Sequence, residues 1–428
     1  MARKMKDSGI EWIGEIPEGW EVLAHKYIMH KEKSICEHYS GEDVISLTLN
    51  GVVKRDLENP SGKMPTTFDG YQFVDPNDLL LCLFDIDVTP RCVGLVKDYG
   101  VTSPAYSRFK IHSGFCNAYY NYLLRFIDDE KVFVHLSKNL RSSLTESDFG
   151  AIKTIVPPKA EQQRIADYLD NRTFEIDTLL SKARSSIEEY KKLKQAVITQ
   201  AITKGVRGER KMKDSGVEWI GEIPREWDLI KATRIIKSTQ NGLTRRNLEK
   251  SDGQIVLKLK NITADGKIDY TYQNRIALSS KELESYALSS GDFLFVRVNG
   301  SKTLVGKCAI FNPIGESVAY NDHIIRVKLS NYCYSKFFFW YLCSSCGKAE
   351  IDLHTSTAAG QYTISGEGLR DITLVFPPID EQKEIADYLD AKCVEIDGLI
   401  AKKEQLVKKL ESYKKSLIYE VVTGKREV

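Results

Sequence analysis

An internal repeat constrains the fold of this chain more than any other feature of its sequence. Residues 3–20, RKMKDSGIEWIGEIPEGW, return as residues 210–227, RKMKDSGVEWIGEIPREW, with differences at only three positions. Identity this close between two parts of one chain indicates duplication rather than chance. We therefore expect the chain to fold as two copies of one design.

A second repeated block shows how far the duplication extends. Residues 155–170, IVPPKAEQQRIADYLD, correspond to residues 375–390, VFPPIDEQKEIADYLD. The first block recurs at an offset of 207 residues and the second at 220, so the second copy has 13 additional residues between its blocks. Dissimilar inserts lie between the blocks, over residues 21–154 and 228–374. Each insert is long enough for a globular domain.

Composition limits the classes of protein to consider. Hydrophobic residues make up 42% and charged residues 28% of the 428 positions, which is typical of a globular chain. The sequence has neither an apolar run long enough to span a bilayer nor an apolar signal core near its start, so we expect a cytoplasmic protein. The net charge is only +2, so a nucleic-acid role must be argued from the distribution of charge.

The nine cysteines are odd in number and irregularly spaced, which favours reduced thiols over a disulfide framework. Cys343 and Cys346 form a CxxC pair. A structural zinc site would need two further ligands at compatible spacing, so we interpret this pair as buried or surface thiols.

Each second block opens an arm that predicts a long helix. Both arms begin with a Pro-Pro pair followed by Glu-Gln, which suits a helix start, and both end near a glycine. Apolar residues recur in steps of three and four, which indicates helices over residues 161–203 and 381–423, each a rod of roughly 60 Å at about 1.5 Å per residue. The predicted stripe comprises Ile176, Leu180, Ala183, Ile187, Tyr190, Leu193, Val197 and Ala201, and then Ile396, Ile400, Leu406, Leu410, Tyr413, Leu417 and Val421, with Lys403 as an interruption.

A helix of this length with one apolar stripe needs a partner. Each arm could pack on its own domain, but the duplication supplies two matching stripes, and antiparallel pairing of the arms buries both of them. The paired arms would then act as a spacer of fixed length. The first arm leads directly into the second copy of RKMKDSG, and the last residues, TGKREV, would return the chain towards Arg3, so the design is circular.

The inserts predict mixed α/β (α+β) domains with much strand. Residues 78–84 and 292–298 are expected to be corresponding strands, each followed by a polar loop, residues 85–91 or 299–303, and then by Val93-Gly94 or Val305-Gly306. The two loops differ sharply, which suggests two readers of different targets, although neutral drift of surface loops is an alternative. The predicted divisions are residues 1–160 and 204–380 for the domains, and residues 161–203 and 381–423 for the helices.

Polar residues on these domains are candidates for contacts with DNA. Basic side chains can neutralise phosphates or reach guanine, and Asn or Gln can pair with adenine. Solvated surface charge is the alternative for each residue taken singly. The loops at residues 141–145 and 360–364, aligned just before the arms, are the stronger candidates. The DNA-binding candidates are Lys54, Arg55, Thr89, Arg91, Arg108 and Arg141 in the first domain, and Arg245, Arg246, Lys258, Lys260, Arg297, Asn299, Ser301, Lys302 and Gln361 in the second.

Motifs for catalysis are not found. Residues 300–308 resemble a phosphate loop but have five residues between the glycines and Cys where Ser or Thr is required. Neither Pro-Pro pair follows Asn or Asp, as in the catalytic tetrapeptide of adenine methyltransferases. The carboxylates that recur in the arms, Glu161, Asp167, Asp170 and Asp177, are interpreted as a solvated helix face. We expect a chain that catalyses nothing by itself.

The duplicated WIGEIPxxW and PPxxEQxxIADYLD blocks, each followed by a long helix, resemble the specificity subunit of type I restriction–modification systems over essentially the whole chain. The resemblance implies two target recognition domains separated by antiparallel helices, which together read a split DNA sequence with a fixed gap. It also implies two methylation subunits that hold S-adenosylmethionine and restriction subunits that use ATP and Mg²⁺. Those cofactors would belong to the partners, and no metal is expected in this chain.

Two domains related by a two-fold and held by a rod should meet one face of a duplex with their centres about 34 Å apart. We further expect the repeated helices and WIGEIP segments to bind the methylation subunits, because these surfaces recur while the domains diverge. A coiled-coil scaffold that carries two protein-binding modules is the alternative from another functional class.

Overall fold

The computed structural model describes residues 3–49, 51–60, 64–137, 142–244, 249–263, 265–358 and 360–428, without the side chains of residues 249–252 and 358. The chain divides into two compact units. Unit 1 comprises Met1–Arg184 with Glu404–Val428, and unit 2 comprises Ser185–Lys403. Within these described ranges, no helix combines the length and apolarity needed to cross a membrane.

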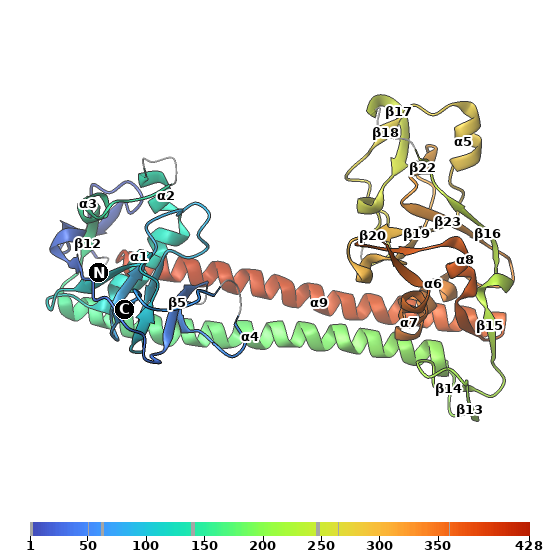
Figure 1. Cartoon of the computed structure of the whole chain (residues 1–428), viewed down its shortest axis with the longest axis horizontal. Helices are drawn as coiled ribbons and strands as arrows, with labels where there is room; N and C mark the ends of the chain where they lie inside the picture. Colours follow the sequence, from blue (N-terminus) through green and yellow to red (C-terminus); the bar gives the residue numbers. More distant parts are fainter. Residues whose placement is uncertain are drawn as a thin grey trace. The chain divides into compact units, whose positions relative to one another are not determined.

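Unit 1 contains four small sheets (Figure 1). Two of them have two strands: β1 (Met5–Asp7) pairs with β2 (Glu15–Pro17), and β3 (Glu21–Ala24) with β12 (Lys153–Val156). An antiparallel sheet has the order β4 (Met29–Lys31), β11 (Ser107–Ile111), β8 (Leu79–Leu81), β9 (Val93–Leu95). The other has the order β6 (Gly51–Lys54), β5 (Val44–Thr48), β10 (Gly100–Thr102), β7 (Gln72–Val74), with β5 and β10 parallel. The short helices are η1 (His25–Tyr27), α1 (Asn117–Asp129), α2 (Val132–Leu136) and α3 (Glu146–Ala151).

Unit 2 repeats this plan. The two-stranded sheets are β13 (Met212–Asp214) with β14 (Glu222–Pro224), and β15 (Asp228–Lys231) with β26 (Thr373–Phe376). The antiparallel sheet has the order β16 (Ile236–Asn241), β23 (Ile324–Leu329), β19 (Phe293–Val296), β21 (Cys308–Ile310). In a three-stranded sheet, β17 (Glu249–Leu257) lies between β18 (Arg275–Ile276) and β22 (Val318–Tyr320). The short helices are η2 (Ala232–Arg234), η3 (Leu259–Asn261), α5 (Ser280–Tyr286), η4 (Lys302–Leu304), α6 (Ser335–Cys343), α7 (Ser345–Leu353) and α8 (Gly366–Asp371).

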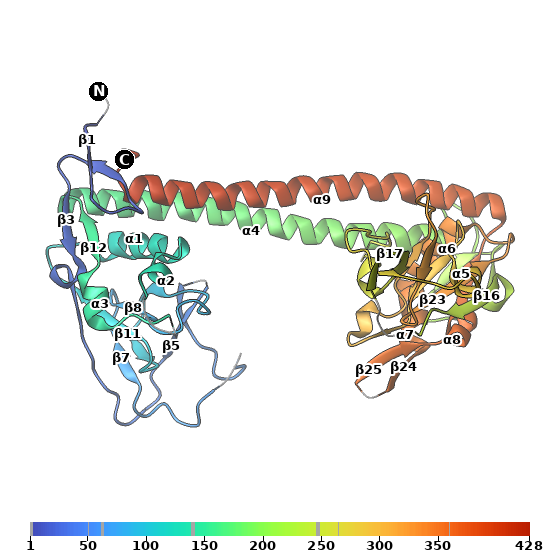
Figure 2. The same ribbon diagram turned by 90° about the horizontal axis from the view of Figure 1, so that it is seen from above.

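Unit 2 also has a sheet without a counterpart among the described residues of unit 1. The strands β24 (Thr355–Ala358) and β25 (Gln361–Ile364) form a hairpin, seen in Figure 2, and β20 (Val298–Asn299) pairs with β25. The expected strands at residues 78–84 and 292–298 are confirmed as β8 and β19. The strand after the loop is shifted in unit 2, because Cys308–Ile310, rather than Val305-Gly306, pairs with β19 as Val93–Leu95 pairs with β8.

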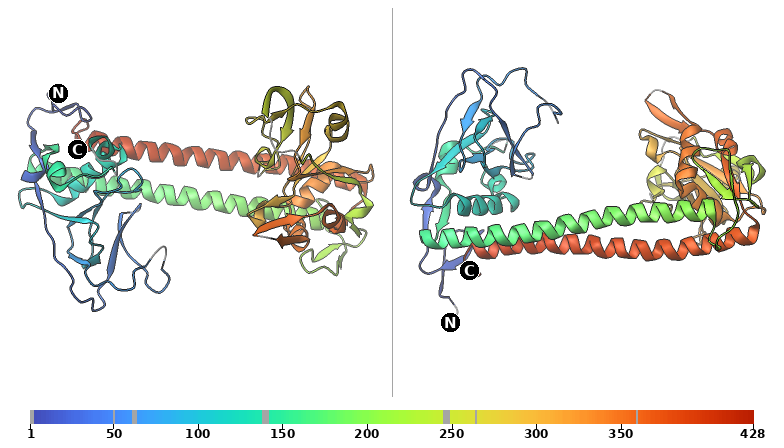
Figure 3. Two further views of the ribbon diagram at one scale, coloured as in Figure 1. Left: turned by 45° about the horizontal axis from the view of Figure 1, so that its top comes forward. Right: turned by 90° about the horizontal axis from the view of Figure 1, so that it is seen from below.

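The arms are the long helices α4 (Lys159–Lys204) and α9 (Ile379–Val422), whose ends lie within two residues of the expected bounds. Within each unit they lie side by side and antiparallel (Figure 3). Lys414 of α9 bonds Asp177 of α4 at 2.6 Å in unit 1, and Lys194 of α4 bonds Asp397 of α9 at 2.6 Å in unit 2. At the offset of 220 these are the same pair with the arms exchanged. The predicted pairing of the arms and the α/β (α+β) fold class are confirmed.

The residues that form the seam between the arms differ in part from the prediction. Ile176, Leu180, Ala183 and Ile187 are buried as expected. Leu193, Leu406 and Tyr413, however, are 49%, 42% and 49% exposed. Lys194, Ile198, Val407 and Lys414, each one residue after an expected position, are partly or fully buried instead. A strict heptad drifts around a helix of 3.6 residues per turn, which explains the displacement.

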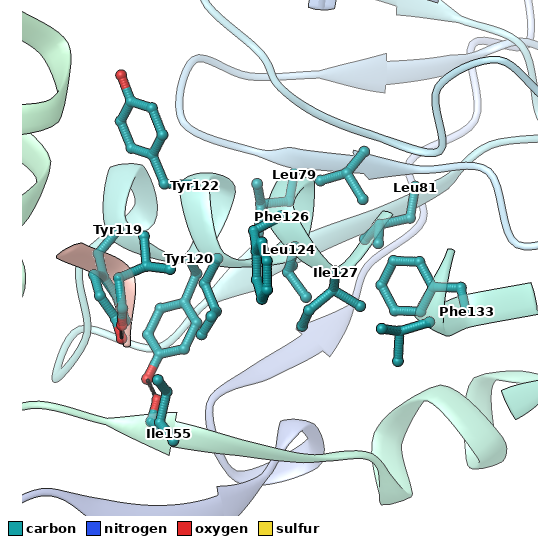
Figure 4. Packing of buried hydrophobic residues seen from close by; sticks show 14 of the residues in the cluster. Leu79, Leu81, Tyr119, Tyr120, Tyr122, Leu124, Phe126, Ile127, Phe133 and Ile155 are labelled. Atoms are coloured by element: carbon teal, nitrogen blue, oxygen red, sulfur yellow. Dashed lines mark hydrogen bonds between the residues drawn. The ribbon is translucent and has the colours of Figure 1, made fainter. Parts of the chain in front are cut away.

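The core of unit 1 draws on both ends of the chain. Figure 4 shows Tyr119, Tyr120, Leu124 and Phe126 of α1 packed between the sheets and the long helices. The Tyr119 hydroxyl donates a 2.9 Å hydrogen bond to the carbonyl of Val422, at the end of α9. The core of unit 2 is equivalent, with Ile198, Ala201 and Ile202 of α4 packed near Trp227. The C-terminal turn of each long helix thus packs on a repeated N-terminal block.

The repeated blocks meet in a buried cluster of Arg, Trp and Glu. In unit 1, Glu161 accepts hydrogen bonds from Trp20 Nε1 at 3.0 Å and from Arg3 at 2.6 Å. In unit 2, Glu381 accepts from Trp227 Nε1 at 3.0 Å and from Arg210. Burial alone would raise the pKa of Glu161, but the bonds from Arg3 and Trp20 outweigh it and lower the pKa. The interpretation of Glu161 as part of a solvated face is therefore wrong.

The glutamine after each glutamate bonds the backbone of the domain. Gln162 Oε1 accepts from the backbone N–H of Cys116 at 2.9 Å, and its Nε2 donates to the carbonyl of Pro157 at 2.8 Å. Gln382 makes the same pair of bonds, to Tyr334 and Pro377, at 2.9 and 2.8 Å. Cys116 and Tyr334 are the N-caps of α1 and α6, so each glutamine fixes a domain helix to a long helix. We call the bonds of Gln162 and of Gln382 the two glutamine locks.

Candidate nucleic-acid interface

In unit 2, the structure gathers several predicted site residues at one sheet edge. The chain leaves β19 at Arg297, whose carbonyl accepts a bond from the backbone N–H of Ile364 at 3.0 Å. Asn299 then faces Tyr362 in the register of β20 and β25, so it lies beside Gln361 at the start of β25. Ser301 and Lys302 continue the same loop into η4.

Side chains at this edge remain available for polar contacts. Gln361 is exposed, and the Ser301 hydroxyl bonds only locally, to Thr303 Oγ1 at 2.9 Å. Lys302 lies 3.7 Å from Asp352, and half-buried Arg297 donates from Nη1 to the carbonyl of Asp322 at 3.0 Å. Amides carry both a donor and an acceptor, which matches the adenine edge in the major groove. This edge can therefore offer both amide and cationic groups to a duplex.

Two further lysines of unit 2 lie in another segment, at η3. Lys260 is exposed, and its Nζ lies 4.0 Å from the centre of the Tyr272 ring. Lys258 is the N-cap of η3, and its backbone N–H donates to Asn261 Oδ1 at 2.9 Å. Arg141, Arg245 and Arg246 lie outside the described residues.

Unit 1 has the equivalent loop after β8. The backbone N–H of Ile86 donates to the carbonyl of Ser142 at 3.1 Å, and that of Leu144 donates to the carbonyl of Leu83 at 2.9 Å. The loop therefore lies against the segment before α3, as the unit 2 loop lies against β25. Thr89 closes a turn inside the loop, where its hydroxyl donates to the carbonyl of Asp85 at 2.8 Å.

Burial argues against one predicted contact of unit 1. Arg108 is 2% exposed and donates from Nε to Asp78 at 2.5 Å, from Nη2 to Asp75 at 2.6 Å, and from Nη1 to the carbonyl of Phe73 at 3.0 Å. The guanidinium supports the packing of β11 against the loop before β8. A side chain enclosed in this way does not reach a duplex, so Arg108 is a structural residue.

Two other predicted cations of unit 1, Arg91 and Lys54, also carry ion pairs. Arg91 has a 12% exposed side chain and bonds Asp129 at 2.7 Å, which links the loop to the end of α1. Lys54 pairs with Asp43 at 2.7 Å, and this bond raises the pKa of Lys54. Lys54 and Arg55 line a hollow that also contains Ser46, Thr48 and Asn59.

Sequence reasoning missed the apolar part of this surface. Leu49, Phe84 and Val88 are 63%, 40% and 74% exposed, and the first two line one hollow together with Thr89 and Arg91. Leu49 stands directly before Asn-Gly, a strong signal for a hairpin turn, which could have placed it at the exposed end of β5.

The long helices present a second candidate surface. Phe174 and Val394 are 74% and 73% exposed, Leu179 and Leu399 are 52% and 36% exposed, and Leu193 and Tyr413 are each 49% exposed. Within each of these pairs the two residues are related by the offset of 220. Unit 1 carries Phe174, Leu179 and Tyr413, and unit 2 carries their three counterparts. Each unit thus exposes apolar side chains at the same three positions of the repeat, and we call these three residues the apolar set of that unit.

Comparisons with known proteins agree with the sequence resemblance. Residues 224–409 match the family model for the type I restriction modification DNA specificity domain. The chain is 25% identical over 284 residues to the type I restriction enzyme StySPI specificity subunit of Salmonella potsdam, an alignment of 66% of this chain and 59% of that protein. It is 26% identical over 247 residues to the EcoKI specificity subunit of Escherichia coli, over 57% of this chain and 51% of that protein. The matches thus span only about half to three-fifths of the length of these relatives.

The fold also has a solved counterpart. A chain from a structure titled as the basis of complex assembly and conformational transition of the type I R-M system superposes with a TM-score of 0.72 at 13% identity, over 96% of this chain and 99% of that chain. At this identity the likeness concerns the fold alone. The resemblance to type I restriction specificity subunits is confirmed.

Proposed function

We propose that this chain, a relative of the specificity subunits of type I restriction enzymes, is the non-catalytic DNA-recognition subunit of a methyltransferase and endonuclease complex. Each unit would read one half of a bipartite, asymmetric double-stranded target and direct methylation and restriction subunits to it. S-adenosylmethionine, ATP and Mg²⁺ would be held by those partners. We expect the complex to act in the cytoplasm.

One observation carries this proposal. The two units place loops of different chemistry at the same position of the same fold, after β8 in unit 1 and after β19 in unit 2. Unit 2 offers Asn299, Ser301 and Gln361 there, whereas unit 1 offers Phe84 and Thr89. Base edges are distinguished by hydrogen bonds and apolar contacts, so equivalent loops with different side chains suit two unlike half-sites.

Exchange of one insert tests the proposal. Residues 21–154 are replaced by the corresponding insert of a relative, residues 228–374 are retained, and the methylated motif is determined by sequencing DNA from cells that express the complex. We expect one half of the motif to change and the other half to remain. A change of both halves would contradict a separate reader in each unit.

Salt dependence separates this function from a protein scaffold. Contacts with several phosphates release counterions, so the affinity for DNA of the chain with its methylation partner should fall steeply between about 50 and 200 mM salt. A scaffold for two protein modules gives no such slope and no preference for one DNA sequence. Binding that is independent of both salt and sequence would favour the scaffold.

The apolar set on the long helices supports a partner that is used twice. Folding explains why the seam recurs in both arms, but it does not explain why exposed positions stay apolar in both. We infer that the sets around Phe174 and Val394 each bind one methylation subunit.

Substitution of one set at a time tests this docking. Phe174→Asp with Leu179→Asp should leave one methylation subunit on the chain, Val394→Asp with Leu399→Asp should do the same, and all four changes should leave none. Native mass spectrometry measures the ratio of subunits. Lys192→Ala, at another exposed position of α4, is the control and should retain both copies. Two bound copies on the fourfold variant would exclude these helix faces.

A further inference from the structure

We propose that unit 1 recognises the C5-methyl groups of thymines in its half of the target, through an apolar groove formed by Leu47, Leu49 and Phe84. This inference rests on the proposed function and specifies the chemical feature of the bases that one domain reads.

Two hollows adjoin here, and the first of them forms the groove. Leu47, Leu49 and Phe84 line the first together with Cys82, Thr89 and Tyr106. The second shares Leu47, Thr48 and Tyr106 with the first and continues along β6 to Val53, Lys54 and Arg55, and polar groups that include Ser46, Asp56 and Asn59 also line it. An apolar hollow therefore adjoins a polar one that carries two cations.

The exposure of Leu49 and Phe84 is unusual because both side chains line one hollow. Leu49 is 63% exposed and Phe84 40%. Single exposed apolar residues are common on protein surfaces, but neighbouring ones that line one groove indicate a binding site. The apolar groups are exposed at the ends of β5 and β8, where the loops of this fold begin.

The position of the groove favours DNA over a protein partner. It includes the loop after β8, the equivalent of the loop after β19 that carries Asn299 and Ser301 in unit 2. A partner that binds both units should require the same surface twice, as the exposed set on the long helices illustrates. The two equivalent loops differ in chemistry, with Phe84 and Thr89 in unit 1 and Asn299 and Ser301 in unit 2, as expected for readers of unlike half-sites. Lys54 and Arg55 at its border have the charge that suits a phosphate backbone.

Thymine is the base that matches an apolar groove of this kind. In the major groove, each base pair presents a distinct pattern, and thymine is the base that carries a methyl group there. Leucine and phenylalanine side chains can bury that methyl group, whereas they cannot satisfy an amino group or a carbonyl oxygen. The hydroxyls of Thr48 and Thr89, which border the groove, already donate to the carbonyls of Gly51 and Asp85 at 2.9 and 2.8 Å, so the apolar side chains carry the recognition.

Deoxyuridine isolates the methyl group, because it keeps every hydrogen-bonding group of thymine. The half-site of unit 1 is first assigned by the insert exchange described above. Binding of the chain with its methylation subunits is then measured on duplexes with deoxyuridine at the thymines of either half-site. We expect about fourfold weaker binding per contacted thymine in the half-site of unit 1, the change that corresponds to one buried methyl group. Replacement in the other half-site should leave the affinity unchanged.

Variants of the groove complete the test. Phe84→Ala and Leu49→Ala should weaken binding to the thymine duplex and abolish its advantage over the deoxyuridine duplex. Leu136→Ala, at a 37% exposed position outside the groove, is the matched control. It should keep both the affinity for the thymine duplex and the advantage of that duplex over the deoxyuridine duplex. Equal binding of the two duplexes by the unaltered chain, or a unit 1 half-site that lacks thymine in both strands, would overturn the inference while leaving the proposed function intact. Absence of any sequence preference would overturn both.

Discussion

At the scale of residues, burial decides which charged side chains contribute most to the stability of the fold. Glu381 has a 2% exposed side chain and binds Arg210 and Trp227, whereas Glu384, one turn further along α9, pairs with Arg207 in solvent. A buried partner cannot be replaced by water, so its loss leaves the remaining charge uncompensated. The sequence presents the two glutamates alike, and only the fold separates their contributions.

Glu381→Ala should therefore lower the free energy of unfolding by up to about 3–5 kcal/mol, because Trp227 loses its acceptor and Arg210 keeps only the half-exposed carboxylate of Glu226. Glu384→Ala, the matched control, should cost much less, because solvent screens an exposed pair. Urea denaturation followed by circular dichroism measures both variants. Equal destabilisation by the two substitutions would show that burial does not set the difference.

His25 makes the stability of unit 1 depend on pH. It is fully buried in η1, with its ring centre 4.6 Å from that of Phe149, and unit 2 has Ala232 in its place. Burial lowers the pKa of His25 from 6.5 to about 4, and the nearby backbone of Phe149 offsets this only in part, because neither ring nitrogen has a hydrogen-bond partner among the described residues.

Above pH 6.5 the ring is neutral in both the folded and the unfolded chain, so His25 adds no pH dependence. Between pH 6.5 and about 4 the unfolded chain binds a proton that the folded chain excludes. The free energy of unfolding therefore falls by roughly 1.4 kcal/mol for each unit by which the pH is lowered. We expect His25→Ala to show a shallower loss of melting temperature between pH 7.5 and 5. The slope is the readout, because the substitution also leaves a cavity. Parallel slopes would contradict this assignment.

At the scale of elements, the periodicity of the sequence predicted the long helices and their pairing but misplaced part of the seam. Hydrophobicity identifies an apolar face and does not say whether a helix or a second protein covers it. Leu193 and Tyr413 were assigned to the seam for that reason, whereas the stems of Lys194 and Lys414 occupy it and their amino groups reach the opposite helix. Long lysine side chains commonly combine buried stems with charged ends.

Charge reversal tests the contact between the helices. Lys194→Glu should weaken the pairing of α4 and α9 in unit 2, because it places two carboxylates together, and Asp397→Lys should do so by placing two ammonium groups together. The double variant restores opposite charges and should recover most of the loss, with a coupling of up to about 1 kcal/mol because the pair is partly exposed. Thermal denaturation of the four chains measures the cycle. Additive losses in the double variant would argue against a direct contact.

The candidate interface, like the long helices, was predictable from the sequence only in part. Spacing after a buried strand predicted Asn299 and Ser301, because strand ends position loops in any sheet, and the alignment of the loop before the arm predicted Gln361. Residue type alone was insufficient for Arg108, since guanidinium groups serve internal carboxylates as readily as phosphates. The apolar groove was not predicted, because exposure of Leu49 and Phe84 depends on how β5 and β8 are brought together by contacts distant in sequence.

At the scale of the whole molecule, unit 1 is completed by the last residues of the chain. Leu417, Val421 and Val422 belong to its core, more than 200 residues beyond the rest of that unit. Unit 2, in contrast, consists of the single segment Ser185–Lys403. The two units should therefore respond very differently to a change at the C-terminus.

A chain that ends at Lys403 should lose the fold of unit 1 and retain that of unit 2. Hydrogen exchange followed by mass spectrometry should show lost protection in β8 and β11, near the other end of the sequence, and preserved protection in β19 and β23. A chain without only residues 427 and 428 is the control. Loss of protection in β19 and β23 to the same extent would show that the units do not fold separately.

The glutamine locks explain how one framework tolerates unrelated domains. Gln162 and Gln382 bond backbone groups of Cys116, Pro157, Tyr334 and Pro377, and a backbone amide is the same whatever side chain it carries. An inserted domain therefore needs only a helix N-terminus in the right place to be accepted, and its sequence is otherwise unconstrained by this attachment. Exchange of one insert for another would therefore require no compensating change at these glutamines.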